Sequence, residues 1–360
     1  MKRITNIWAQ VVSFENLWRA YRTARLGKRT RRGVAEFGLN LERELLSLQC
    51  ELADGSYRPG AYRQFTIYER KPRLISAAPF RDRVVHHAIM QLLEPILDRK
   101  FIYDSYACRR GKGVHAAMTR YQAWAQTYRY VLKMDVQRYF PSIDHVLLKD
   151  KLRRMIGDGR VLTLLDLLID GSPRLEAELD YFPGDNLLSP LGRRRGIPIG
   201  NLTSQFFANL YLNDLDHEIK QVWNVRPYLR YVDDMIILDD NKHRLADIRV
   251  WMRERLAKER LRLHPHKAQV SPVKVGLNVL GYVVTPTRRR LRNDNGHRFA
   301  RKLRGQIRAC RASRMDWSTV VASVQSWIGH AQHAETAGLR RTIFSQAGLI
   351  GGAGHLVSDG

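Results

Sequence analysis

The chain has few cysteines, few acidic residues and no long apolar run, and each shortage excludes a class of protein. Only Cys50, Cys108 and Cys310 occur in 360 residues. They form no Cys-x-x-Cys pair, so neither a disulfide framework nor a zinc ribbon is indicated. No apolar run reaches the roughly 18 to 20 residues of a membrane span, and the N-terminus lacks a secretory signal pattern. We therefore expect a cytoplasmic protein without a membrane segment.

The shortage of acids leaves a strongly positive chain. There are 61 lysines and arginines against 35 aspartates and glutamates, a formal net charge of +26. Hydrophobic residues make up 44% of the chain, which is enough for a folded core. A folded surface with this charge attracts a polyanion, and nucleic acid is the natural partner.

Hydrophobic periodicity gives a coarse order of elements. Residues 1–60 are predicted to be helical, 62–77 to form two strands around a basic turn, and 79–97 to form a helix interrupted near Pro95. A strand over 130–140 leads to a helix with Ser142 as its N-cap and Asp144 in its first turn. The remaining predictions are an irregular insertion over 170–196, a helix over 203–222, a hairpin over 227–239, a charged helix over 244–260, a strand over 277–285 and basic helices after it.

Two acidic positions indicate chemistry. The apolar strand before Asp135 ends in this lone carboxylate, and Asp233 and Asp234 lie between two apolar runs in LRYVDDMIIL. An isolated acidic pair in a hairpin is usually a solvated turn. Nucleotide transfer, however, needs two magnesium ions, for which Mn²⁺ can substitute, and magnesium prefers hard carboxylate oxygens. A strand-end aspartate beside a hairpin pair would supply them, so Asp135, Asp233 and Asp234 are the predicted metal ligands.

A third segment, RRRGIPIGNLTSQFFANLYLNDLDHEIK, completes the pattern, with Gly196 and Gly200 bracketing a turn before a helix. In this order the three segments resemble the palm motifs of reverse transcriptases. YERKPRLISAAPFRDRVVHHAI and DSYACRRGKGVHAAM resemble the fingers of the group II intron kind, and HPHKAQV resembles the motif that follows the aspartate pair. The resemblance covers roughly residues 55 to 335.

The run IGNLTSQ narrows the resemblance. Most reverse transcriptases have glutamine where this chain has Ile199, and the run is similar to that of diversity-generating retroelement enzymes. Those enzymes copy a template RNA, misincorporate opposite adenine, and work with a small basic accessory protein oligomer. Defence-associated bacterial reverse transcriptases share much of this core and remain the alternative, as does a nucleic-acid-binding protein with an inactive polymerase core.

The resemblance also implies roles for individual residues. It gives Lys267 as a catalytic lysine that protonates the leaving pyrophosphate, and Phe140 as a sugar gate. Phe140 could instead be a core aromatic, and the basic residues of the fingers turn could form a solvated turn. The implied nucleotide-binding residues are Lys71, Arg73, Phe140, Ile199 and Gln205. Aromatic stacking beside cations suits single strands, so the predicted nucleic-acid contacts are Tyr106, Arg109, Arg110 and Lys112.

The implied fold is an α/β right-hand polymerase with an antiparallel palm sheet flanked by helices. The expected parts are an N-terminal helical extension over 1–54, fingers and palm over 55–285, a basic helical thumb over 286–350 and a flexible tail over 351–360. The expected partners are template RNA, the nascent cDNA, dNTPs and the accessory protein.

Overall fold

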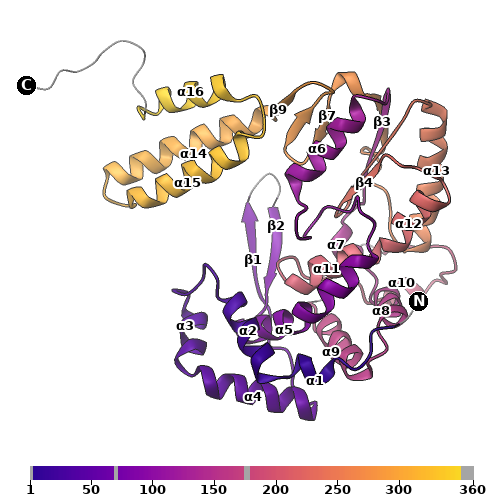
Figure 1. Cartoon of the computed structure of the whole chain (residues 1–360), viewed down its shortest axis with the longest axis vertical. Helices are drawn as coiled ribbons and strands as arrows, with labels where there is room; N and C mark the ends of the chain where they lie inside the picture. The colour runs from indigo at the N-terminus through magenta and orange to yellow at the C-terminus, as the bar shows by residue number, and fades with distance from the viewer. Residues whose placement is uncertain (1–2, 69–71, 174–178, 350–360) are drawn as a thin grey trace, which may run out of the picture. The chain divides into compact units, whose positions relative to one another are not determined.

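The computed structural model describes residues 3–68, 72–173 and 179–349. The chain divides into two compact units. The first contains Met1–Arg110, Lys133–Ile236 and Ala246–Gln269, and the second contains Gly111–Leu132, Ile237–Leu245 and Val270–Gly360. Architecture and sheets are those of a mixed α/β protein (Figure 1), as the sequence predicts.

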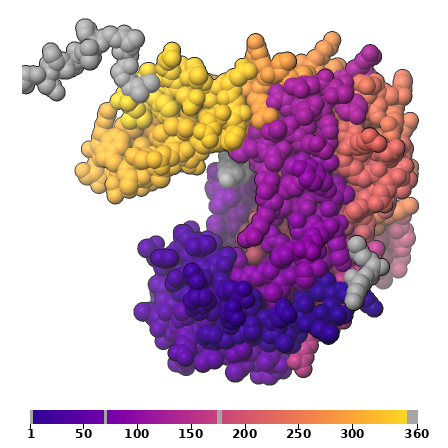
Figure 2. All heavy atoms as spheres, viewed as in Figure 1, coloured from indigo at the N-terminus to yellow at the C-terminus, as the bar shows by residue number. Residues whose placement is uncertain are grey.

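The N-terminal segment is helical, as predicted, and forms a closely packed body of atoms in Figure 2, where it is indigo. Ser13 caps α2 by accepting a hydrogen bond from the Asn16 amide, and rings of Tyr21, Phe37 and Phe80 join α2, α3 and α5 at centroid distances of 5.3–6.1 Å. The helices are α1 (Trp8–Val11), α2 (Phe14–Ala24), α3 (Arg32–Leu39), α4 (Leu41–Asp54) and α5 (Phe80–Leu97), followed by the short η1 (Asp98–Lys100).

Helix α5 runs through Pro95 without a break, so the predicted interruption is wrong. Pro95 lies in the last turn, where only one main-chain hydrogen bond is lost. Leu93 and Leu97, on either side of it, are fully buried, and this packing holds the turn in helical form.

The two strands predicted over 62–77 are confirmed. Strand β1 (Arg63–Tyr68) pairs antiparallel with β2 (Pro72–Ala77). Residues 69–71, with Lys71, lie outside the described residues. At the other end of β2 the Ser76 amide donates to the Ile199 carbonyl at 3.2 Å, which ties the hairpin to the glycine-bracketed segment.

A four-stranded sheet carries the acidic motifs. Its strands are β3 (Tyr130–Asp135), β4 (Tyr228–Tyr231), β5 (Asp234–Asp239) and β6 (Gln269–Pro272), in the order β4-β5-β3-β6. The predicted hairpin is β4–β5, and since β3 is the neighbour of β5, the end of β3 lies beside the turn. The helices of this region are α7 (Tyr139–Ser142), α8 (His145–Met155), α9 (Gly159–Asp170), α10 (Ser189–Gly192), α11 (Leu202–Tyr211), α12 (Asn213–Gln221) and α13 (Lys242–Lys258).

Several predicted boundaries differ from the structure. Ser142 is not an N-cap: α8 is capped by Asp144, whose Oδ1 accepts from the amides of Val146 and Leu147. The predicted helix over 203–222 is two helices that meet at Leu212. The predicted strand over 277–285 is a hairpin, because Leu280 and Gly281 both have positive φ and turn the chain back.

The second unit holds a three-stranded sheet and the basic C-terminal helices. Phe299 stacks on Trp327 at 4.2 Å, and the Trp327 indole donates to the side chain of Asn295, so α14 and α15 pack closely. The elements are α6 (Val114–Ala125), η2 (Val273–Val275), β7 (Leu277–Val279), β8 (Tyr282–Val284), β9 (Arg289–Leu291), α14 (Asn293–Arg311), α15 (Trp317–Ala331) and α16 (Ala337–Gln346). Within the described residues no helix is both long enough and apolar enough to span a bilayer.

Candidate active site

Three carboxylates meet where β3 ends and the β4–β5 turn begins. Asp135 is the last residue of β3, Asp233 lies in the two-residue turn, and Asp234 opens β5. The Val136 amide donates to the Asp233 carbonyl at 3.3 Å, which links the loop after β3 to the turn. As predicted, the strand-end aspartate and the hairpin pair are therefore adjacent, at one end of the two inner strands β3 and β5.

The electrostatics of these residues reflect their closeness. Burial, together with the negative charges of Asp135 and Asp234, raises the pKa of Asp233 to about 6. A second and a third carboxylate nearby disfavour the charged form of the first. The three carboxylates therefore favour a nearby cation, because its positive charge offsets their mutual repulsion.

Two lysines form ion pairs with these carboxylates. Lys267 forms an ion pair with Asp135, and Lys133 Nζ lies 3.1 Å from Asp234 Oδ1. In the part of the chain that is described, no three His, Cys, Asp or Glu side chains converge closely enough to enclose a metal ion. The donor chemistry nevertheless fits a hard divalent cation, because all three acids offer carboxylate oxygens at one edge.

Lys133 is absent from the sequence predictions, although a signal for it exists. It lies two residues before Asp135 in the strand, and residues two apart project from the same face. A polar residue in that register of an otherwise buried strand could have been assigned to the site.

The turn between β4 and β5 has a strained backbone. Val232 has a φ of +55°. A β-branched residue in this left-handed region is an outlier that costs about 1–3 kcal/mol. Such a conformation persists only where the surrounding structure holds it.

Arg230 supplies the support, and the sequence predictions do not include it. Its side chain is fully buried, and its Nη1 donates to the Val232 carbonyl at 3.0 Å. The guanidinium also bonds to both carboxylate oxygens of buried Asp216 and to the Asn209 carbonyl. An arginine within an apolar strand signals a buried acidic partner, and this signal precedes the acidic pair by only three residues.

The predicted nucleotide-binding residues lie in several elements. Ile199 is half-buried and accepts from Ser76, while Gln205 is exposed in α11. Phe140 is half-buried in α7 and meets Tyr139 edge-on at 5.9 Å. Arg73 is exposed on β2, opposite Ile67. These positions stay predictions.

Two of the predicted nucleic-acid contacts are engaged inside the protein. Tyr106 is 3% exposed and donates to Asp104, so its ring is not available for stacking on a base. Arg109 is bidentate to Asp98 and also donates to the carbonyls of Ile102 and Ser105. We correct both assignments to structural roles, because these side chains hold the loop before α6.

Arg110 and Lys112 remain candidates for nucleic-acid contact. Arg110 is exposed and Lys112 is half-buried.

Comparison with known proteins identifies the family. The model of the family "Reverse transcriptase (RNA-dependent DNA polymerase)" matches residues 64–284, a segment that contains all three aspartates and Lys267. The chain belongs to the reverse transcriptase family.

Among the similar proteins, Protein YkfC of Escherichia coli is 27% identical over 279 residues, covering 66% of this chain and 70% of YkfC. The group II intron-encoded protein LtrA of Lactococcus lactis is 24% identical over 184 residues, covering 50% of this chain and 29% of LtrA. Apo telomerase from Candida tropicalis has a TM-score of 0.48 at 12% identity, covering 66% of this chain and 49% of that chain. The matched part of the present chain therefore covers less than a third of the length of LtrA.

Proposed function

We propose that this reverse transcriptase copies a dedicated template RNA into cDNA, with Asp135, Asp233 and Asp234 at its catalytic centre. The observation that carries the proposal is the meeting of these carboxylates at the end of β3 and the β4–β5 turn, with Lys267 paired to Asp135. In this position the Lys267 ammonium can donate a proton to the leaving pyrophosphate.

Reverse transcriptase domains generally use divalent metal ions, and the three carboxylates would hold them here. When bound, two such ions activate the attacking hydroxyl and stabilise the leaving oxygen. The chain's own contribution is to fix the carboxylates: β3 positions Asp135, and Arg230 holds the turn that carries Asp233 and Asp234.

Primer extension on an RNA template with Mg²⁺ tests the catalytic assignment. We expect Asp233→Asn to reduce nucleotide addition by at least a hundredfold, because it removes charge stabilisation worth several kcal/mol. RNA binding should change little, since the basic surface dominates affinity. Asp247→Asn, which makes the same charge change at an exposed position of α13, is the matched control. Extension by Asp233→Asn within tenfold of wild type would contradict the assignment.

We further propose that the enzyme is error-prone at template adenine and acts with a small basic accessory protein, as the IGNLTSQ resemblance implies. Ile199 supports the loss of fidelity: a glutamine amide could hydrogen-bond near the nascent pair, and an isoleucine side chain cannot. A lost hydrogen bond of this kind reduces discrimination by about 1–3 kcal/mol, or roughly 5- to 150-fold. The adenine preference comes from the resemblance alone.

Sequencing of cDNA from wild type and Ile199→Gln on one adenine-rich RNA tests this proposal. We expect excess errors opposite adenine in the wild type and fewer in the variant. Equal error spectra, or a wild type without excess errors at adenine, would remove the mutagenic function and favour a defence-associated enzyme.

A further inference from the structure

A second candidate binding site lies in the first unit, apart from the carboxylates. It is a groove of about 630 Å³. It is lined by helix α13, here called its wall, by the segment Leu261–Pro265, its floor, and by the aromatic loop 181–183, its rim. The lining residues are Gln137, Tyr181, Phe182, Pro183, Arg249, Arg253, Ala257, Leu261, Arg262, Leu263, His264, Pro265 and Ala268.

The lining is cationic. Arg249 and Arg253 come from α13, Arg262 and His264 come from the floor, and none of the described lining residues is an aspartate or glutamate. Arg262 is paired with Asp180 at 3.2 Å, beyond the lining, so α13 contributes most of the positive charge. A groove of this composition selects an anionic ligand.

The two arginines of α13 are four residues apart, so they stand on one face with their Cβ atoms about 6 Å apart. This places them in a row along the wall. A free triphosphate is typically held by converging main-chain amides of a glycine-rich loop or a helix N-terminus. A row of arginines instead suits successive phosphates of a strand.

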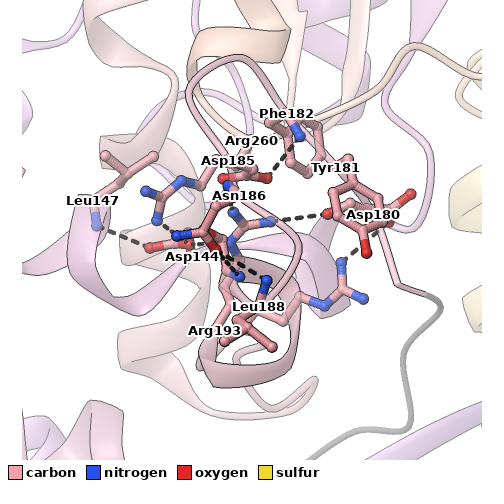
Figure 3. Close-up of polar contacts among 12 residues, drawn as sticks. Asp144, Leu147, Asp180, Tyr181, Phe182, Asp185, Asn186, Leu188, Arg193 and Arg260 are labelled. Carbon is pink, nitrogen blue, oxygen red and sulfur yellow. Dashed lines mark hydrogen bonds and ion pairs between the residues drawn. The ribbon is translucent and has the colours of Figure 1, made fainter.

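The aromatic rim is held in place by buried ion pairs (Figure 3). Arg193 is 6% exposed at its side chain, pairs with Asp185 and Asp144, and donates to the Asp180 carbonyl at 3.0 Å. The Phe182 amide donates to Asp185 Oδ2 at 2.7 Å. Phe182 is buried, and the guanidinium groups of Arg193 and Arg262 each lie 5.4 Å from its ring centroid.

Next to this anchor, Tyr181 is 47% exposed on the groove's rim. Its hydroxyl donates to the Leu187 carbonyl at 3.3 Å, which limits the rotation of the ring. An exposed tyrosine beside a row of cations is the arrangement that binds single-stranded nucleic acid, by stacking on a base while the cations hold the backbone.

We propose that this groove binds a single-stranded segment of RNA, with phosphates on Arg249 and Arg253 and a base stacked on Tyr181. The proposal rests on the proposed function, which makes RNA the natural substrate. The groove also adjoins the segment that carries Asp135. The Gln137 amide donates to the Arg262 carbonyl and the His264 amide to the Asp135 carbonyl, both at 2.8 Å. RNA held there would lie beside the segment that is hydrogen-bonded to the main chain of Asp135.

Photo-crosslinking tests the groove without requiring catalysis. The probe is an unstructured 20-nucleotide RNA containing 4-thiouridine, incubated with the full chain in the absence of dNTPs. We expect crosslinks to map to residues 179–183 or 262–268. Crosslinks confined to other segments would overturn the proposal, as would displacement of the RNA by free ATP at comparable molar concentration, which would indicate a mononucleotide site.

Matched charge reversals give the second measurement. The double variant Arg249→Glu/Arg253→Glu should weaken binding of the 20-mer at least tenfold. Lys242→Glu/Lys258→Glu makes the same charge change at exposed ends of the same helix and should weaken it less than threefold. Equal losses in the two doubles would mean that only overall charge matters and would overturn the proposal.

Two further readouts separate folding and catalysis from groove binding. Tyr181→Ala leaves the charge unchanged and should abolish the crosslink to residues 179–183 with a three- to tenfold loss of affinity; retention of both would overturn the stacking contact. Extension of a primer–template with a one-nucleotide template overhang reports on catalysis without a long single strand. A wild type that fails to extend would contradict the proposed function, while the crosslinks would still report on the groove.

Discussion

Arg230 shows how one buried residue supports the geometry of the acidic β4–β5 turn. Burying a guanidinium is costly unless every donor finds a partner. Here Asp216 takes the charge, Asn209 accepts further bonds, and the remaining donor reaches the Val232 carbonyl. Burial of both partners removes solvent screening, and the pair therefore acts as a rigid support under the acidic turn.

Arg230→Met tests this support. The variant leaves the Asp216 carboxylate buried and uncompensated, so we expect a loss of about 3–5 kcal/mol in the free energy of unfolding, measured with urea. The double variant Arg230→Met/Asp216→Leu should recover most of that loss. It still lacks the donor to Val232, so primer extension should stay at least tenfold below wild type. Full activity of the double variant would show that the turn does not need Arg230.

At the scale of elements, ion pairs hold residues 179–195, before α11, in place. Asp144 has no exposed side-chain surface, caps α8, and pairs with Arg193 at 3.4 Å and Arg260 at 2.7 Å. Arg260 and Asp144 come from segments more than a hundred residues apart. Asp144 thus links Arg193 of the insertion to Arg260 of the palm (Figure 3).

We expect Arg193→Ala to release this insertion locally. Removing the guanidinium breaks the pairs to Asp185 and Asp144 and the bond to the Asp180 carbonyl. Limited digestion with chymotrypsin should then cut after Tyr181 or Phe182 at least fivefold faster. Arg153→Ala, which removes a more exposed pair with Asp166, is the control and should digest at the wild-type rate. Unchanged digestion of Arg193→Ala would contradict the anchoring role.

The sequence predicts elements best where periodicity and turn chemistry agree. The β1–β2 pair follows from two short strands around a basic segment. The β4–β5 hairpin and the position of Asp135 follow from apolar strands that end at acidic residues. The choice of Asp144 over Ser142 as the cap does not, because it depends on Arg193 and Arg260, which reach it only in the folded chain.

The predicted contacts at Tyr106 and Arg109 failed for the same reason. The residue types suggested contact with nucleic acid. In the folded chain, however, these side chains bond to protein groups such as Asp98. Local sequence patterns therefore indicate which residue types could contact a ligand. Long-range contacts in the folded chain determine which of those side chains remain accessible to it.

At the scale of the whole molecule, buried histidines tie stability to pH. Burial lowers the pKa of His86 to about 4, and its Nδ1 lies 2.8 Å from the Thr203 hydroxyl. As the pH falls, His86 therefore binds a proton near pH 6.5 in the unfolded chain but only near pH 4 in the folded chain. The stability contributed by the neutral ring is complete above pH 6.5 and is lost as the pH falls through this window. Burial lowers the pKa of His87 and His145 as well, so they act in the same direction.

We expect His86→Gln to reduce this acid sensitivity. A glutamine can keep a hydrogen bond to Thr203 and does not titrate. Between pH 7.5 and pH 4.5 the wild type should lose about 2–3 kcal/mol more of its unfolding free energy than the variant, at 1.36 kcal/mol per pKa unit. Urea titrations at both pH values measure the difference. His243→Gln, at an exposed position, should behave like wild type, and a His86→Gln profile parallel to wild type would contradict the assignment.

The bond from Arg230 to Val232 also bears on how this enzyme can diverge. Loss of Asp216 alone would leave a buried cation, and loss of Arg230 alone a buried anion, so either step passes through a destabilised intermediate. Descendants that abandon the pair must change both positions nearly together and find another donor for the turn. Across related reverse transcriptases, the residues at these two positions should therefore be inherited as a unit, even where the surface around the turn has drifted.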